Sequence, residues 1–315
     1  MHVLGRVIAL LPTALGVNLA MLLGILIGRL LPIRGRVVRA NIDLAFGDSL
    51  DRQEKRRLFL EAYKSLCLLA VESAYLRYGQ PEWILDRVVE TDGLDRLLAA
   101  IEGDRPVISI GGHLGNWEMA GAFGAHKFPV TTLAKPLHNR LVQEDVRTSR
   151  ERQGLQIIWA GSDKTNTNTP RAVFKAFRAG RAVHFFVDQD MGHAGVFVPY
   201  FGHPASTTAA PALIALKSNA LIFPGHLIRL GPTRHRFVIG EVIDPATIPE
   251  GTREEQVLHL TQRITASIED LVRLYPAQYF WFHRRWKTTP EAVARKQRSR
   301  ARKREAARRR AASSA

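Results

Sequence analysis

A histidine and a glutamate five residues apart occur in the stretch GGHLGNWEMAG, residues 111–121. The stretch follows the short β-rich run RPVISI and precedes a helical pattern for which Asn116 is a suitable N-cap. On a continuous helix, His113 and Glu118 would face about 140° apart. If His113 lies in the turn before the helix, the Glu118 carboxylate can fold back to the imidazole, fix its tautomer and stabilise its charged form. The pair is therefore a candidate general base and its orienting acid, although a lone histidine is more often structural.

The turn around His113 also offers backbone donors. The glycine pair and the N-terminus of the following helix would leave N–H groups unpaired near the imidazole, where they suit a phosphate or a developing oxyanion. Gly112 and Asn116 are therefore candidate substrate-binding residues.

Strands and helices alternate on both sides of this turn, which predicts an α/β fold. The pattern contains no internal repeat and no linker, so we expect a single domain over 35–290 with a central, mostly parallel or mixed sheet covered by helices. A helical stretch ending before Gly79 leads into it. The expected strands are 105–110, 128–135, 155–160, 181–190, 221–230 and 236–243, and the expected helices are 51–78, 139–153, 170–180, 208–219 and 253–275.

An uncharged run of 22 residues separates Arg6 from Arg29, about the length needed to cross the hydrocarbon core of a bilayer. We expect a membrane-anchor helix over 7–28, because LLPIRGR follows where a signal peptide would have small residues before its cleavage site. Pro12 and Asn18 weaken a full span, so a shallower, monotopic insertion remains an alternative.

Basic residues set the expected orientation of this anchor. Four arginines lie between 29 and 39 on its C-terminal side, against Arg6 alone on the other, which predicts a catalytic body facing the cytoplasm from the inner membrane. Small residues every four positions could let another helix approach closely, although such residues are common in membrane helices. They are Gly16, Ala20, Gly24 and Gly28.

The net charge of +16 is partly local, because residues 291–315 hold ten Lys and Arg against two Glu. Such a run predicts a disordered basic tail that touches anionic lipid headgroups or nucleic acid. The single cysteine, Cys67, excludes a disulfide or cysteine metal site within the chain. The histidines do not show a metal-ligand spacing, so we predict no metal and no cofactor.

The stretch with His113 and Glu118 resembles the H-x-x-x-x-E signature of the lipid A biosynthesis acyltransferases, a branch of the lysophospholipid/glycerolipid acyltransferase superfamily. The resemblance extends over roughly residues 1–288, with further blocks in the family's order. The last block departs from the family's pattern at Ala277, where the family has glutamate. The blocks are RANIDLAF (39–46), KPLHN with RERQG (135–154), FFVDQDMGHAGVFVPYFGHPASTT (185–208) and PAQYFWFHRRWK (276–287).

The resemblance implies transfer of a fatty acyl chain from an acyl carrier protein thioester to a hydroxyl of a glycolipid, a lipid A precursor. His113 would deprotonate that hydroxyl, and Glu118 would orient the His113 ring. The alkoxide would then attack the thioester directly, with no covalent acyl-enzyme intermediate. Arg150 matches a family arginine and is a candidate ligand for a phosphate of the acceptor, with Arg147 or Arg152 as alternatives if the helix register differs. Asp188 matches a family aspartate in or near the active site. The structural alternatives are a solvated helix face for Arg150 and a turn cap for Asp188.

The sequence also allows other donors, other acceptors and a non-enzymatic function. Acyl-CoA could replace acyl carrier protein as the co-substrate, and the acceptor could be another lysophospholipid, ornithine lipid or glycolipid. The basic surface would speed encounters with acidic carrier protein and anionic lipids. A membrane-tethered nucleic-acid binder built on the basic tail is the non-enzyme alternative, but we expect no specific nucleic-acid partner.

Overall fold

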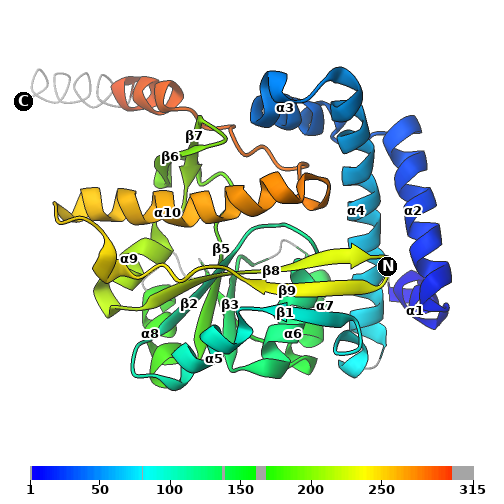
Figure 1. Ribbon diagram of the computed structural model, residues 1–315, viewed down its shortest axis with the longest axis horizontal. Helices are drawn as coiled ribbons and strands as arrows, with labels where there is room; N and C mark the ends of the chain where they lie inside the picture. The colour runs from blue at the N-terminus through cyan, green and yellow to red at the C-terminus, as the bar shows by residue number, and fades with distance from the viewer. Residues whose placement is uncertain (1, 80, 137–138, 161–167, 300–315) are drawn as a thin grey trace, which may run out of the picture.

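A seven-stranded sheet, in the order β1-β9-β8-β2-β5-β3-β4, forms the centre of the protein in a computed structural model (Figure 1). The structure describes residues 2–79, 81–136, 139–160 and 168–299. The sheet is parallel except where β8 and β9 form an antiparallel hairpin. Its strands are β1 (Val88–Asp92), β2 (Val107–Gly111), β3 (Val130–Ala134), β4 (Gln156–Trp159), β5 (Ala182–Phe186), β8 (Leu221–Gly231) and β9 (Arg234–Ile239).

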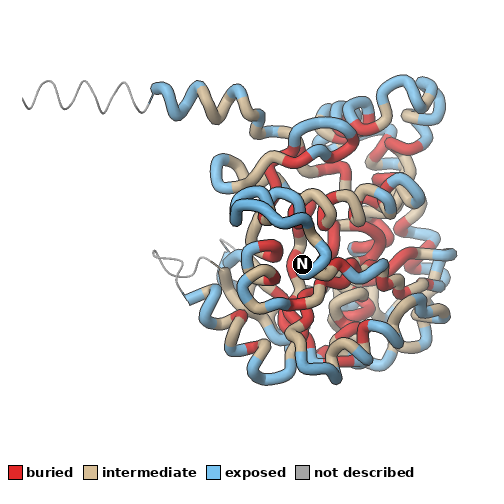
Figure 2. Tube along the Cα trace, turned by 60° about the vertical axis from the view of Figure 1, so that its left-hand side comes forward, coloured by how far each residue is buried: buried red, intermediate tan, exposed pale blue. Residues whose placement is uncertain are grey.

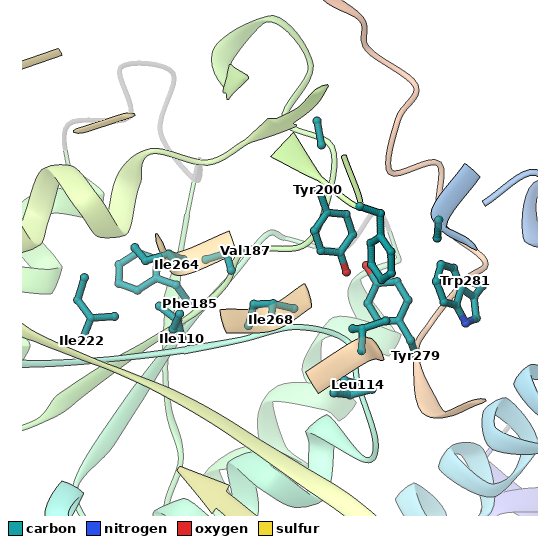
Figure 3. Packing of buried hydrophobic residues seen from close by; sticks show 14 of the residues in the cluster. Ile110, Leu114, Phe185, Val187, Tyr200, Ile222, Ile264, Ile268, Tyr279 and Trp281 are labelled. Carbon is teal, nitrogen blue, oxygen red and sulfur yellow. The ribbon is translucent and has the colours of Figure 1, made fainter. Parts of the chain in front are cut away.

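Helices cover both faces of this sheet, as the strand–helix alternation predicts. Helices α9 and α10 pack on one face, and α5 and α6 pack on the other. Figure 3 shows Ile264 and Ile268 of α10 against Ile110, Phe185 and Ile222 of the strands. The expected single α/β domain is therefore confirmed. These helices are α5 (Leu94–Glu102), α6 (Trp117–Lys127), α7 (Arg140–Arg152), α8 (Asn168–Arg178), α9 (Ala210–Ser218) and α10 (Arg253–Leu274).

Strands β1, β6 (Val196–Tyr200) and β7 (His203–Thr207) and helix α5 were not expected from the sequence. Strand β1 pairs in parallel with β9 at the sheet edge, and its sequence VVETD lacks a continuous apolar run. Strands β6 and β7 form a separate antiparallel hairpin whose turn holds Phe201 and Gly202 at positive φ. Helix α5 connects β1 to β2. Short 3-10 helices occupy Gly47–Ser49, Pro81–Ile84, Gly192–Ala194, Pro245–Thr247 and Pro276–Gln278.

The predicted N-terminal helix over 7–28 is two helices, α1 (His2–Leu10) and α2 (Thr13–Leu30). Pro12 separates them because it has no N–H to donate and disfavours helical geometry in Leu11. By length and composition, α2 is the one helix in the described part of the chain that could cross a membrane. After α3 (Gly35–Phe46), the long helix α4 (Arg52–Tyr78) begins with an Asp51–Glu54 capping box. It ends before Gly79, which is where the sequence predicts its end.

The small residues of α2 do permit a close helix approach, and the partner is α4 of the same chain. Gly16, Ala20, Gly24 and Gly28 are all buried. A Cβ added to Gly24 would lie 2.5 Å from the Cα atom of Lys64, so a larger residue here would force the helices apart.

The basic tail differs from the prediction over its first nine residues, 291–299. Residues 290–299 are helical and project from the body, whose buried residues lie mostly at its centre (Figure 2). Thr289 Oγ1 accepts a hydrogen bond from the Ala292 N–H, and Pro290 suits the first helical position. Residues 300–315 of the predicted tail lie outside the described residues.

Candidate active site

Two neighbouring parallel strands bring His113 and Asp188 together. Strand β2 ends at Gly111 and β5 ends at Phe186, and these two residues are paired in the sheet register. His113 and Asp188 each follow their strand by two residues, so both emerge at the same edge of the sheet. This register is a tertiary fact that the sequence alone does not provide.

The Asp188 carboxylate holds both the ring and the backbone of His113. Its Oδ1 lies 2.8 Å from His113 Nδ1, and its Oδ2 accepts the His113 backbone N–H at 2.7 Å. Because an ionised carboxylate only accepts, Nδ1 carries the proton and Nε2 keeps its lone pair. The one described side-chain contact to Nε2 is a long one, 3.5 Å from Gln189 Nε2. The imidazole is therefore oriented as a base with Nε2 free to take a proton.

Charges around the imidazole also set its basicity. Burial by itself would lower the pKa of His113, but the Asp188 carboxylate outweighs it and the pKa is raised above its ordinary value. Burial opposes the ionised form of Asp188 as well, yet the contacts with His113 hold the pKa of this carboxyl well below its usual range. Asp188 thus stays charged and stabilises the imidazolium that forms when His113 accepts a proton.

Glu118 does not orient His113, which corrects the expectation from the sequence. Helix α6 begins at Trp117, so Glu118 lies in its first turn and extends toward α7. There Arg150 Nη2 donates to Glu118 Oε1 at 2.7 Å and Nε donates to Oε2 at 3.2 Å. The Glu118 charge contributes to the raised pKa of His113 from a distance, after the larger effects of burial and Asp188.

The backbone N–H groups of the turn are also occupied, contrary to expectation. The Gly112 N–H donates to His226 Nε2 at 2.9 Å, and the His113 N–H is taken by Asp188. Gly112 is required for another reason: a Cβ there would lie 2.8 Å from Ile268 Cγ2 and would push α10 away. Gly112 therefore packs the turn against α10 and does not offer its N–H to a substrate.

Asn116 is a structural cap and not a substrate ligand. The side chain is fully buried, and its Oδ1 accepts the Met119 N–H at 3.0 Å, so the predicted N-cap is confirmed. Its Nδ2 donates to Glu72 Oε2 at 2.7 Å. Burial opposes the charge of Glu72, but Arg229 and His235 together lower the pKa of this glutamate to about 2. A buried charged cluster from α4, β8 and β9 thus fixes the start of α6.

A cavity that opens to solvent lies between α6 and the sheet. Two rings that line it also pack against His113, Trp117 at 4.9 Å and Phe186 at 4.6 Å between centroids. The deeper walls are mostly apolar, with the Ser109–His184 pair among them. Burial lowers the pKa of His184 to about 3, so this pair is neutral.

Glycines keep this cavity open. Gly121 and Gly124 of α6 line it from the helix side, and Gly225 of β8 lines it from the sheet side. A Cβ on Gly121 would lie 3.3 Å from Leu155 Cδ2. The space therefore exists because facing positions lack side chains.

A second depression lies beside the Glu118–Arg150 pair, and both residues line it as well as the cavity. Its other basic residues are Arg77 and Lys135. Arg77 is paired with Asp145, whereas Lys135 is exposed. The ion pair therefore lies where an apolar cavity meets a basic groove.

The C-terminal block closes over the catalytic turn. The Phe280 N–H donates to the His113 carbonyl at 2.9 Å, and Tyr279 forms an isolated antiparallel β-bridge with Leu114. Arg285 is 1% exposed and donates to the Ser206 carbonyl and to Thr207 Oγ1. These contacts hold the C-terminal block against the turn that carries His113 and against strand β7.

The sequence did not identify Trp117 and Phe186 as neighbours of His113, since neither side chain is acidic, basic or nucleophilic. Their places in the sequence could have indicated them. Trp117 begins the helix that follows His113, and Phe186 ends the strand that precedes Asp188. Among the described residues, no group of three or more His, Cys, Asp or Glu side chains could hold a metal ion.

Comparison with known proteins places these features in a family. The sequence model of bacterial lipid A biosynthesis acyltransferase matches residues 1–288. The chain is 26% identical to the lipid A biosynthesis palmitoleoyltransferase of Escherichia coli, over 82% of this chain and 80% of that protein. It is 25% identical to the E. coli lipid A biosynthesis lauroyltransferase, over 86% and 85%. It is also 25% identical to the phosphatidylinositol mannoside acyltransferase of Mycolicibacterium smegmatis, over 61% and 60%. The chain belongs to the bacterial lipid A biosynthesis acyltransferase family and is an acyltransferase.

Proposed function

We propose that this enzyme transfers a fatty acyl chain from an acyl carrier protein thioester to a hydroxyl of a lipid A precursor, with His113 as general base. The observation that carries the proposal is the imidazole held by Asp188 through Nδ1, with only a long contact at Nε2. Trp117 and Phe186, which line the apolar cavity, pack against the same imidazole. The family match supports the reaction class.

In the proposed mechanism, Nε2 of His113 removes the hydroxyl proton as the oxygen attacks the thioester carbonyl. The tetrahedral intermediate collapses with cleavage of the C–S bond. The thiolate then receives the proton from the imidazolium. Asp188 keeps Nδ1 protonated and stabilises the imidazolium in between. Direct transfer requires no acyl-enzyme.

Arg150 is proposed to contact a phosphate, with Glu118 holding its guanidinium in place. Glu118 receives hydrogen bonds from Nε and Nη2, which leaves Nη1 for another anion. The neighbouring Lys135 adds positive charge to the same groove. A phosphate of the acceptor, or of the donor's pantetheine arm, would satisfy this chemistry.

The cavity beneath α6 is the proposed site of the acyl chain. Each methylene transferred from water to such walls contributes about 0.8 kcal/mol, roughly a fourfold preference per carbon. Depth of the cavity would therefore select chain length. The proposal requires no metal and no bound cofactor, with acyl carrier protein or CoA carrying the chain.

The proposed location is the inner membrane, with the catalytic domain facing the cytoplasm. The family and the apolar helix α2 suggest membrane association. Anionic lipids, the glycolipid acceptor and acyl carrier protein are the proposed partners. No specific nucleic acid is proposed.

A second acceptor class is favoured by one observation: the chain also resembles phosphatidylinositol mannoside acyltransferases. Purified enzyme would therefore be assayed with acyl carrier protein and CoA donors, against a lipid A precursor and a phosphatidylinositol mannoside, with products identified by mass. We expect acylated lipid A precursor, preferentially from the carrier-protein donor. Acylation of the mannoside alone would move the assignment to the second class.

The role of His113 is tested in the same assay. His113→Gln should reduce turnover by on the order of 10³-fold or more, because positioned proton transfer is lost. His203→Gln, on the exposed hairpin strand β7, is the matched control and should retain activity. A folded His113→Gln protein with normal turnover would exclude the proposed base.

A further inference from the structure

Helix α2 is attached to the catalytic domain along its entire length. It runs antiparallel to α4, with Gly16 against Tyr75, Gly24 against Lys64 and Gly28 against Tyr63. Figure 1 shows the two helices side by side. The contact therefore extends from the first turn of α2 to its last.

Helix α4 is in turn part of the domain core. Its buried Glu72 forms an ion pair with Arg229 of β8, and its Tyr63 packs against Phe282 with ring centroids 4.9 Å apart. α2 therefore cannot enter the bilayer without bringing α4 and the part of β8 that contacts α4 to the same depth.

This attachment conflicts with a helix that crosses the bilayer. The 18 residues of α2 span roughly 27 Å, close to the thickness of the hydrocarbon core. A crossing would place the partly exposed Lys64–Glu61 ion pair of α4 at hydrocarbon depth. Charged side chains and a folded domain do not enter lipid readily. α2 is then better accommodated lying along the membrane surface.

The face of α2 opposite α4 has the composition for that position. It carries six exposed leucines in a stripe roughly 100° wide by helical geometry. No charged side chain lies between Thr13 and Gly28. Exposed apolar stripes of this kind mark a surface for a partner or a membrane. The six are Leu15, Leu19, Leu22, Leu23, Leu26 and Leu30, each 45–71% exposed.

A basic groove adjoins the C-terminal end of this stripe. It lies between α2, α3 and α4, and five arginines line it. Asp43, Asp48 and Asp51 also line the groove, so positive charge exceeds negative charge there. Lys55 pairs with Asp43 at 3.1 Å, whereas none of the five arginines forms an ion pair with a described carboxylate. Unpaired guanidinium groups beside an apolar stripe match the headgroup layer of an anionic bilayer. The five are Arg29, Arg39, Arg52, Arg56 and Arg57.

We infer that α2 lies in the plane of the membrane surface, with its leucine stripe among the acyl chains and the basic groove holding phosphates of anionic phospholipids. The inference rests on the membrane association in the proposed function and specifies its geometry. Since no segment of the described chain then crosses the bilayer, the domain stays on the side where it is synthesised. The basic residues flanking α2 are then not needed to set this orientation.

Depth measurements along α2 test the inference without any substrate. Single cysteines would replace Leu15, Leu22 and Leu30 in a Cys67→Ser protein, which removes the native cysteine. Each would carry an environment-sensitive fluorophore, with quenching by lipids spin-labelled at known depths. In phosphatidylcholine vesicles containing phosphatidylglycerol, we expect similar shallow depths at all three positions. A maximum of depth at Leu22, with both ends at opposite surfaces, would overturn the inference in favour of a span.

Charge removal tests the groove. The triple variant Arg52→Gln, Arg56→Gln and Arg57→Gln should weaken partitioning to phosphatidylglycerol vesicles by on the order of 100-fold, with little change on pure phosphatidylcholine. The matched control removes the same charge from α8 and should bind normally. Equal loss in both triple variants would refute the groove as a headgroup site. The control residues are Arg171, Lys175 and Arg178, all exposed.

These experiments separate the inference from the proposed function. An enzyme that binds vesicles in the expected manner but acylates no lipid would contradict only the proposed reaction. An active enzyme whose α2 labels report a crossing helix would contradict only the membrane geometry.

Discussion

Replacing Asp188 with asparagine should inactivate the enzyme by changing the tautomer of His113. The two carboxylate oxygens face two donors, the His113 backbone N–H at 2.7 Å and the ring Nδ1–H at 2.8 Å. Asparagine has one oxygen, and the backbone N–H cannot rotate or lose its proton. The amide oxygen should therefore face the backbone and its NH₂ group should face Nδ1.

An NH₂ group facing Nδ1 requires that nitrogen to accept, which moves the ring proton to Nε2. Nε2 then has no lone pair with which to remove a proton from the acceptor hydroxyl. We expect turnover to fall by on the order of 10³- to 10⁴-fold, as for other bases whose tautomer is fixed by a carboxylate. Loss of a charge-assisted hydrogen bond alone, about 1.5–3 kcal/mol, would account for only about 10- to 150-fold.

The pH dependence provides a second readout of the same variant. In the wild type, Asp188 raises the pKa of His113, so kcat/KM should fall as the pH drops through that raised pKa and the base becomes protonated. Without the negative charge the imidazolium is less stable, the pKa of His113 falls, and the acid limb moves to lower pH. Glu118→Gln, which breaks the pair with Arg150, should move this limb less.

The measurement is kcat/KM for acyl transfer from pH 5 to 9, with circular dichroism to confirm that each variant is folded. Near-normal turnover of a folded Asp188→Asn protein would refute the tautomer argument. A larger downward shift of the limb in Glu118→Gln than in Asp188→Asn would restore Glu118 as the principal partner of His113.

Glu72→Gln should lower the free energy of unfolding by about 3 kcal/mol at pH 7, measured by urea denaturation, because Arg229 would keep its buried charge without a partner. The free energy of unfolding of the wild type should fall by a similar amount as the pH drops from 4.5 toward 2, since folding depresses the pKa of Glu72 to about 2. The variant should not show this loss of stability. Gly121→Leu should fill the cavity toward Leu155 and shift the donor preference to shorter acyl chains. The measurement is kcat/KM for donors of increasing chain length, and an unchanged chain-length preference would place the acyl chain outside this cavity. Deleting 291–315 should leave acyl transfer largely intact in the same assay, and loss of transfer in a folded deletion variant would give the basic tail a part in the reaction.

Much of this protein was determined by sequence patterns that act locally. Short apolar runs alternating with amphipathic helices give the α/β sheet, since each pattern matches the period of its element. Asn116 caps α6 and Asp51 caps α4, because short polar side chains bond the first N–H groups of a helix. His113 was located at a strand end from its flanking residues alone.

Tertiary structure decided which groups meet. Glu118 is near His113 in sequence, yet it pairs with Arg150 from α7, while Asp188 reaches His113 from 75 residues away. Strand register across β2 and β5 sets that contact, and register depends on packing that no single segment encodes. The same holds for α2: its composition reads as a membrane span, but its packing against α4 supports a surface position, because a helix fixed to a charged domain cannot enter lipid alone.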